Sequence, residues 1–144
     1  MIDVTSVMHA ALTIISSNST VVNCGFKVDL HEAFNFDPNR TPWVGIYNQG
    51  IALEPYRANT TLPWMARYDI RVYVQAHSFT SGQTANDLLH KSLKVVLDAL
   101  NGNRSLDGTV LKITGWDIVP FLREIEEGDW LFTDEVTLRA EQYA

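Results

Sequence analysis

The chain has 144 residues, of which 46% are apolar and 19% are charged. That length suits one domain with its own core, and that composition is typical of a globular rather than a disordered protein. Seventeen acidic residues against eleven basic ones leave a net charge of −6. We therefore expect no general electrostatic binding of nucleic acid, because domains that bind it in this way are usually strongly basic.

The single cysteine, Cys24, excludes an intramolecular disulfide and a cysteine-based metal site. The first twenty residues lack the basic segment and uninterrupted apolar run of a secretion signal. No stretch reaches about 18 apolar residues, the length that predicts a membrane span. We expect a chain that has no membrane partner and is made in a cytoplasm-like compartment.

Apolar residues recur at helical spacing near the start of the chain and predict an amphipathic helix. The stripe consists of Val4, Val7, Met8, Ala11, Leu12 and Ile15. Asp3 or Thr5 is a candidate N-cap, and the polar run Ser16–Ser19 predicts the end of the helix. Residues 20–30 are expected to be extended, and residues 35–42 are rich in turn formers.

A hairpin is expected over residues 43–56. The two strands would be Trp43–Tyr47 and Ile51–Tyr56, joined by the loop Asn48-Gln49-Gly50. A three-residue loop that ends in glycine suits a hairpin with a bulge.

The strongest strand pattern covers Arg67–His77, where apolar and polar residues alternate. The apolar side consists of Tyr68, Ile70, Val72, Val74 and Ala76. This alternation predicts a strand with one buried face and one solvated face. His77 falls on the solvated face, and His9 and His90 fall off the apolar stripes of the helices, so all three are expected at the surface.

A second amphipathic helix is predicted over Ala85–Leu100, with Thr80 or Ser81 as its cap and Asn101-Gly102 as its stop. A turn at Asp107-Gly108 then leads to an expected strand at 109–114. Residues 116–129, first apolar and then acidic, are expected to contain a loop. Alternation over Trp130–Gln142 predicts a closing strand.

This order of elements lacks the repeated strand–helix–strand alternation of a doubly wound parallel sheet. The sequence predicts an α+β fold in one domain, residues 1–144. We expect an antiparallel or mixed β-sheet with two α-helices packed on one face and a projecting β-hairpin.

A search for chemistry finds no catalytic, cofactor-binding or metal-binding residues. The glycines form no phosphate-binding loop, and no Gly-x-Ser-x-Gly marks a hydrolase nucleophile. His31-Glu32 begins a zinc-like pattern, but Asn35 stands where the second histidine would be needed. The sequence therefore favours a protein that is not an enzyme and needs no cofactor.

Aromatic residues gather around the expected hairpin, and aromatics are favoured at the centres of protein interfaces. The hypothesis is a subunit or tube contact made by Trp43, Tyr47, Asn48, Gln49, Gly50, Tyr56 and Trp64. The alternative is that Trp43 and Trp64 fill the core, as large aromatics in small domains usually do.

Four segments together suggest a family. They are the hairpin start Pro42–Tyr47, the alternating strand Tyr68–Val74, the leucine-rich helix Ala85–Leu100 and the closing stretch Asp134–Arg139. In this order, after a leading helix, the chain resembles the tail terminator proteins of long-tailed bacteriophages, also called tail-to-head joining or tail completion proteins.

The resemblance implies a structural virion protein at the head–tail interface, assembled in the host cytoplasm. Such proteins form a homo-hexameric ring on the tail tube protein, stop polymerisation of the tube and dock the neck or head-completion protein. DNA crosses the ring without specific binding. The family has no catalytic residues to transfer to this chain.

The net charge resides in the last thirty residues. Residues 1–114 carry nine acids and nine bases, whereas residues 115–144 carry eight acids and two bases. One hypothesis is that Glu124, Glu126 and Glu127, expected in one loop, line the channel of a ring, where an acidic wall would let DNA slide. The alternative is a solvated loop and strand face.

Two other functions stay open. The chain is either another phage neck or head-completion protein or, less in keeping with the residues, a small α+β ligand-binding or enzymatic domain. A pocket with perturbed titratable groups would mark the latter.

Overall fold

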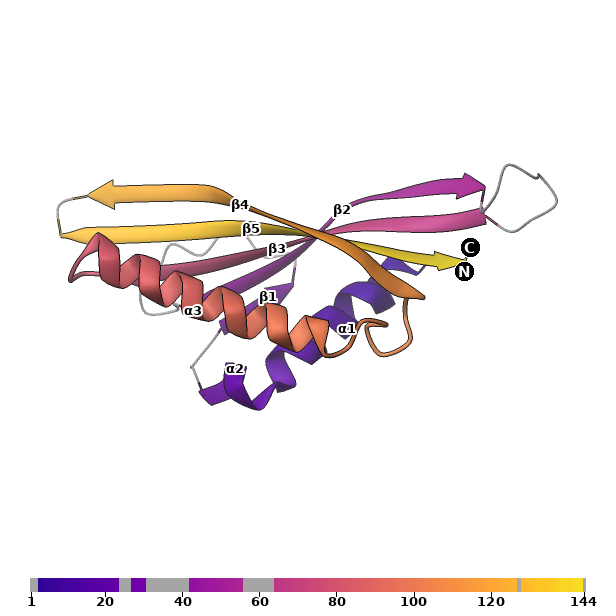
Figure 1. Ribbon diagram of the computed structural model, residues 1–144, viewed down its shortest axis with the longest axis horizontal. Coiled ribbons are helices and arrows are strands. Elements are labelled where there is room, and N and C mark those ends of the chain that lie inside the picture. The colour runs from indigo at the N-terminus through magenta and orange to yellow at the C-terminus, as the bar shows by residue number, and fades with distance from the viewer. Residues whose placement is uncertain (1–2, 24–26, 31–41, 56–63, 127, 144) are drawn as a thin grey trace.

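Two helices, three strands, a third helix and two further strands follow one another in a computed structural model that describes residues 3–23, 27–30, 42–55, 64–126 and 128–143. The elements are α1 (Val4–Ser17), α2 (Ser19–Asn23), β1 (Lys27–Leu30), β2 (Trp43–Pro55), β3 (Trp64–Ser78), α3 (Gly82–Asn101), β4 (Lys112–Glu126) and β5 (Asp129–Tyr143). Figure 1 shows long strands that lie above the helices.

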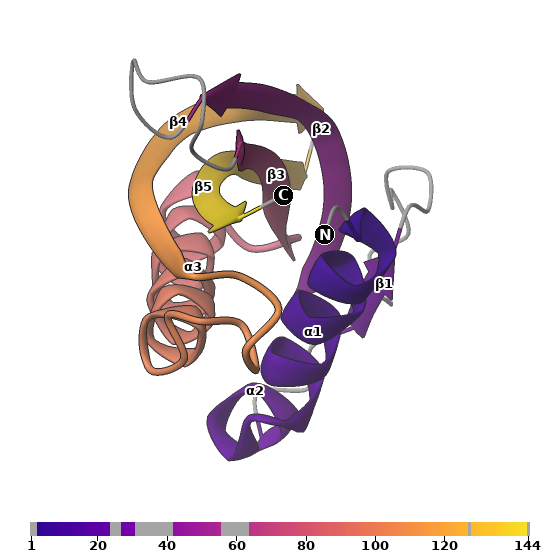
Figure 2. The same ribbon diagram turned by 90° about the vertical axis from the view of Figure 1, so that its right-hand side faces the viewer.

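The strands form one sheet in the order β1-β2-β3-β5-β4. β1 runs parallel to β2, and every other neighbouring pair is antiparallel, so the sheet is mixed. Both main helices, α1 and α3, pack on the concave side of the curved sheet (Figure 2). The predicted α+β fold with two helices on one face is confirmed.

The first helix forms as the stripe predicts. Asp3 is its N-cap: its carboxylate accepts hydrogen bonds from the Ser6 amide at 3.0 Å and the Ser6 hydroxyl at 2.7 Å. These hydrogen bonds, the hydroxyl's first, lower the pKa of Asp3. Val7, Met8 and Ile15 are fully buried in the core, so the apolar stripe faces the sheet.

The expectation of an extended segment over residues 20–30 is wrong for its first part, where α2 forms. The side chain of Asn18 caps this short helix, because its Oδ1 accepts from the amides of Thr20 at 3.0 Å and Val21 at 3.2 Å. Among the described residues of this segment, Lys27–Leu30 pairs as a strand, alongside Trp43–Ile46.

The expected hairpin loop at Asn48-Gln49-Gly50 is wrong. β2 is one continuous strand that pairs with β3 along its whole length, and the extra residue is absorbed by a bulge between Asn48 and Gly50. A long partner strand that offers hydrogen bonds to both halves favours this arrangement. The hairpin that projects from the sheet is formed by β2 and β3 instead, paired out to Pro55 and Trp64.

The expected short strand at 109–114 and the long loop after it are also wrong. β4 pairs with β5 from Lys112 to Glu126, with bulges between Ile113 and Gly115 and between Pro120 and Leu122. β5 supplies a partner of equal length, so the acidic residues of β4 lie on an edge strand rather than in a loop.

A tight turn connects α3 to β4. Leu106, Asp107 and Gly108 all have positive φ angles, at 47°, 57° and 80°. The amide of Asp107 donates to Oδ1 of Asn103 at 3.0 Å, and the side chain of Leu106 is fully buried. The turn is therefore anchored from inside the fold.

Candidate assembly surfaces

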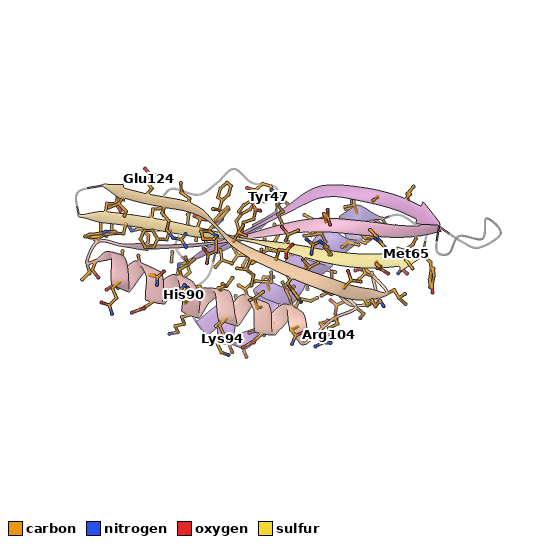
Figure 3. The ribbon with its side chains drawn as sticks, turned by 45° about the horizontal axis from the view of Figure 1, so that its top comes forward. Tyr47, Met65, His90, Lys94, Arg104 and Glu124 are labelled. Carbon is orange, nitrogen blue, oxygen red and sulfur yellow. The ribbon has the colours of Figure 1, made fainter. Side chains whose placement is uncertain are left out.

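The face of the sheet that points away from the helices carries a row of aromatic rings. Tyr47 on β2 meets Tyr73 on β3 edge to face at 5.4 Å, and Tyr73 meets Phe121 on β4 at 4.9 Å. Figure 3 shows Tyr47 near the middle of the sheet. The rings link three strands across this face.

A polar group borders these rings. Nη1 of Arg71 donates to Oε2 of Glu135 at 3.3 Å. Burial is the main reason that the pKa of Tyr73 is raised, and its hydrogen bond with Arg71 is the main reason that the pKa of Arg71 is raised. Both groups therefore keep their ordinary protonated forms at neutral pH, which suits a structural network better than acid–base chemistry.

The expectation of a solvated face along β3 holds only near its start. Arg67 and Asp69 are exposed, but Tyr73, Gln75 and His77 are buried. Nε2 of Gln75 donates to Oγ1 of Thr133 at 3.1 Å. Hydrogen bonding between neighbouring strands thus allows polar residues at these positions to be buried.

His77 does not lie at the surface as expected. Its side chain is only 4% exposed, its Nε2 pairs with Oδ1 of Asp129, and its ring meets Phe79 edge to face at 4.4 Å. Asp129 starts the strand next to β3, a proximity that sequence alone does not show. His9 and His90 are exposed, as predicted.

Three of the hypothesised interface residues are described with their surroundings. Trp43 is fully buried and its ring lies across Gly45, where a Cβ atom would collide with it. Trp43 pairs with Gln75 and is therefore buried on the face away from the helices, outside the core between the sheet and the helices. Tyr47 is half-buried, and Gly50 lies at the bulge of β2. Tyr56 lies outside the described residues, and only the backbone is described for Asn48, Gln49 and Trp64.

Apart from Glu127, which is outside the described residues, the acids of the last thirty residues lie on β4 and β5, and five of them are paired. Ion pairs join Arg123 to Asp134 at 2.7 Å, Arg67 to Glu141 at 3.9 Å and Arg139 to Asp117. Glu135 and Asp129 are also paired, so part of the charge concentrated in this segment is compensated within the described residues.

Of the three acids proposed for a channel, one side chain is described. Glu124 lies exposed on β4 (Figure 3) and has no ion pair within the described part of the chain. Glu126 ends β4, with its side chain outside the described set, and Glu127 lies wholly outside it.

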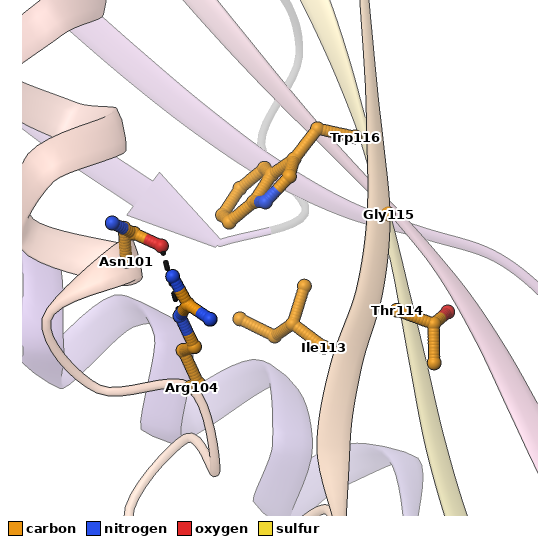
Figure 4. A pocket seen from close by; sticks show the side chains of 6 residues that line it. All are labelled: Asn101, Arg104, Ile113, Thr114, Gly115 and Trp116. Atoms are coloured by element: carbon orange, nitrogen blue, oxygen red, sulfur yellow. Dashed lines mark hydrogen bonds between the residues drawn. The ribbon is translucent and has the colours of Figure 1, made fainter.

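A groove runs between the end of α3 and the edge strand β4, apolar in one part and more polar in the other, where Arg104 and Asn101 line it. One hollow of about 250 Å³ is lined by Leu97, Asp98, Asn101, Trp116 and Ile118. A second of about 200 Å³ shares Asn101 and Trp116 and extends along β4 to Ile113. Figure 4 shows Ile113 and Trp116 turned into this second hollow, with Thr114 turned away.

Sequence reasoning missed this groove because its β4 side was assigned to a loop. Four of the nine large apolar side chains that are exposed among the described residues lie in β4: Ile118, Val119, Phe121 and Ile125. The alternation of Trp116 and Ile118 was the available signal. Pro120 and its bulge interrupt that alternation.

Within the described ranges, no group of three or more His, Cys, Asp or Glu residues is placed to hold a metal ion. None of the described helices combines the length and apolar character needed to cross a bilayer. The surface features of the described residues are the aromatic rings of the outer face, the β4 edge and its groove.

A comparison of the sequence with protein-family models and with curated proteins finds no match. The fold, by contrast, is similar to a chain in a solved structure described as the virion of a native gene transfer agent particle. That similarity has a TM-score of 0.62 at 15% identity and covers 95% of this chain and 94% of the other. The class of protein defined here is thus an α+β domain with the fold of a virion chain.

Proposed function

We propose that this protein is a structural component of a phage or phage-like virion, and that its role is that of a tail terminator. The observation that carries the proposal is the fold similarity to a virion chain over nearly the full length of both. The order of the elements, which also suggests the tail terminator family, is a second line of support.

As a terminator, the chain would form a hexameric ring on the last ring of the tail tube and stop its growth. Ring formation needs a heterologous contact, in which two different surfaces of each copy meet around a closing axis. Each copy offers two different surfaces for such a contact, because its two sheet edges, β4 and β1–β2, differ in length and in side chains.

The remaining surfaces would serve the other partners. We propose that the bulged part of β2, with Tyr47, Asn48, Gln49 and Gly50, contacts a neighbouring subunit or the tube protein, and that Tyr56 and Trp64 contribute to the same contact. The opposite side of the ring would dock the neck protein, and DNA would cross the channel past Glu124, Glu126 and Glu127 without specific binding.

Inactivating the gene in the element that encodes it tests the proposal. We expect particles with overlong tails that fail to join filled heads, because nothing stops growth of the tube. Electron micrographs of the tails measure their length, and expression of the intact chain in trans is the control. Tails of normal length beside leaking or tailless heads would instead identify a head-completion protein, the second candidate.

A further inference from the structure

The sheet has two edges that differ in kind. β4 ends the strand order on one side, and on the other side β1 pairs only with Trp43–Ile46 of β2. Beyond that point, within the described residues, no strand lies beside Ile51–Leu53. Ile51 is 37% exposed and Leu53 is 49% exposed, so an apolar stretch of strand faces solvent.

This stretch lies at the same end of the sheet as the groove beside β4. The strand registers define a row that crosses the whole sheet: Ile51, Tyr68, Ala140 and Ile113. Ile51 is therefore level with a residue that lines the groove. A copy beside this one at the same height would bring its Ile51–Leu53 stretch to the groove.

The side chains also lie on the matching face. Ile51 and Leu53 pair with Tyr68 and Ala66, which belong to the core between sheet and helices. Because side chains directly opposite each other lie on one face of a sheet, Ile51 and Leu53 point to the helix side. Trp116 and Ile118 pair with core residues of β5 in the same way.

The strand directions agree too. Each step from β2 through β3 and β5 to β4 reverses direction, so β2 and β4 run antiparallel within one copy. Rotation about an axis near the strand direction leaves every strand pointing as before. The β4 edge of one copy would then meet the β2 edge of the next in the antiparallel arrangement, the more stable pairing.

We propose that the groove beside β4 receives a second copy of this chain. Ile51–Leu53 of the neighbour adds to the β4 edge as an extra strand. Its Ile51 side chain enters the hollow lined by Ile113 and Trp116, and its Leu53 side chain meets Leu111, which is 46% exposed just before β4. Pro120 limits this pairing to the first half of β4, since proline has no amide hydrogen to donate.

The contact is heterologous and leaves one free edge on each copy, so it repeats until a ring closes. The inference deepens the proposed function and rests on it for the ring, because it names the surfaces that would join the subunits. Both edges lie in one fold, so no partner of another kind is needed to satisfy them.

Two variants that each block one edge test the proposal. Leu53→Lys places a charge on the β2 edge and Leu111→Lys places one where that edge would pack beside β4, and both positions are exposed enough for the fold to survive. Sedimentation velocity over a concentration series measures assembly. We expect the wild-type chain to form oligomers with rising concentration and each variant to associate at least 100-fold more weakly.

The equimolar mixture of the two variants is the sharpest measurement. Each partner then has one intact edge, and the two intact edges are complementary, so we expect a heterodimer and nothing larger. Phe79→Lys, at a residue 65% exposed and away from both edges, is the matched control and should assemble as the wild type does. Circular dichroism checks the fold, with Leu53→Ser and Leu111→Ser as milder versions.

A mixture that stays monomeric, a single variant that assembles normally, or a wild-type chain that is monomeric at millimolar concentration overturns the contact. These outcomes are separate from a failure of the proposed function. Normal tails in particles that lack the chain, together with a heterodimer in the mixture, would reject the terminator role and leave the edge contact standing.

Discussion

The two faces of the sheet are both buried along much of their length, but by different chemistry. Toward the helices lie aliphatic and aromatic side chains such as Ile70, Val72 and Leu138, all fully buried. On the opposite face, Gln75 and Thr133 are equally buried but hydrogen-bonded to each other. Apolar packing tolerates approximate partners, whereas a buried polar pair requires a specific one. Apolar packing on the helix side therefore contributes mainly to stability, whereas the polar pair on the opposite face helps to fix the register of β3 against β5.

The largest effect is expected from a cavity on the helix side. Leu138→Ala removes a fully buried side chain from the middle of β5 and should lower the free energy of unfolding by about 2–5 kcal/mol. Urea unfolding followed by circular dichroism measures the change. Leu53→Ala, at an exposed residue, is the control and should cost far less.

An effect of intermediate size is expected on the opposite face. Thr133→Val removes the hydroxyl that accepts from Gln75 at 3.1 Å and leaves a buried amide without that partner. The loss should be about 1–3 kcal/mol in the free energy of unfolding.

The double variant Gln75→Leu with Thr133→Val sharpens this comparison. Because both polar groups are then gone, it should be less destabilised than Thr133→Val alone. A double variant whose loss equals the sum of two single losses would contradict the proposed coupling.

A smaller effect is expected at alkaline pH, also on the outer face. The raised pKa of Tyr73, caused mainly by burial, means that the folded protein holds the phenol proton more tightly than the unfolded chain. The resulting stability is present below the ordinary tyrosine pKa of 10.0 and is lost as pH rises through the higher folded value. Tyr73→Phe removes the titrating phenol, so this variant should lose less stability at alkaline pH. The melting temperature, followed across roughly pH 8–11 around the ordinary tyrosine pKa, measures the difference. A dependence of melting temperature on pH that is the same in Tyr73→Phe as in the wild type would contradict this prediction.

The smallest effect on stability is expected where neither face is involved. Changing Glu124, Glu126 and Glu127 to Lys should leave folding and tail assembly intact but slow the passage of DNA, since a basic channel would hold the duplex. Ejection rates of particles that carry the triple variant measure this. Ejection at the wild-type rate would support the alternative of a solvated acidic strand end.

Much of the fold could be predicted from local pattern. The two main helices are defined by apolar stripes together with side-chain caps, Asp3 and Ser81. Alternation identified the helix-side faces of β3 and β5, because each face is uniformly apolar over several residues. These signals are local: each depends on neighbours within a few positions of the chain.

The errors arise where a distant partner decides the structure. β2 looked like two strands because the turn-like triplet Asn48-Gln49-Gly50 was judged without β3 beside it. β4 looked like a loop because Pro120 and the acids were judged without β5. In the candidate site, the burial of Trp43 and the groove beside Trp116 likewise depend on segments far apart in the sequence.

The left-handed turn between α3 and β4 helps to determine the width of the groove. Leu106 and Asp107 adopt a backbone conformation that costs a residue other than glycine roughly 1–2 kcal/mol each, and the buried side chain of Leu106 holds it in place. This loop sets the gap between the last turn of the helix and the first residues of the edge strand. A one-residue insertion or deletion in this turn would change the width of the groove without changing any of the residues that line it.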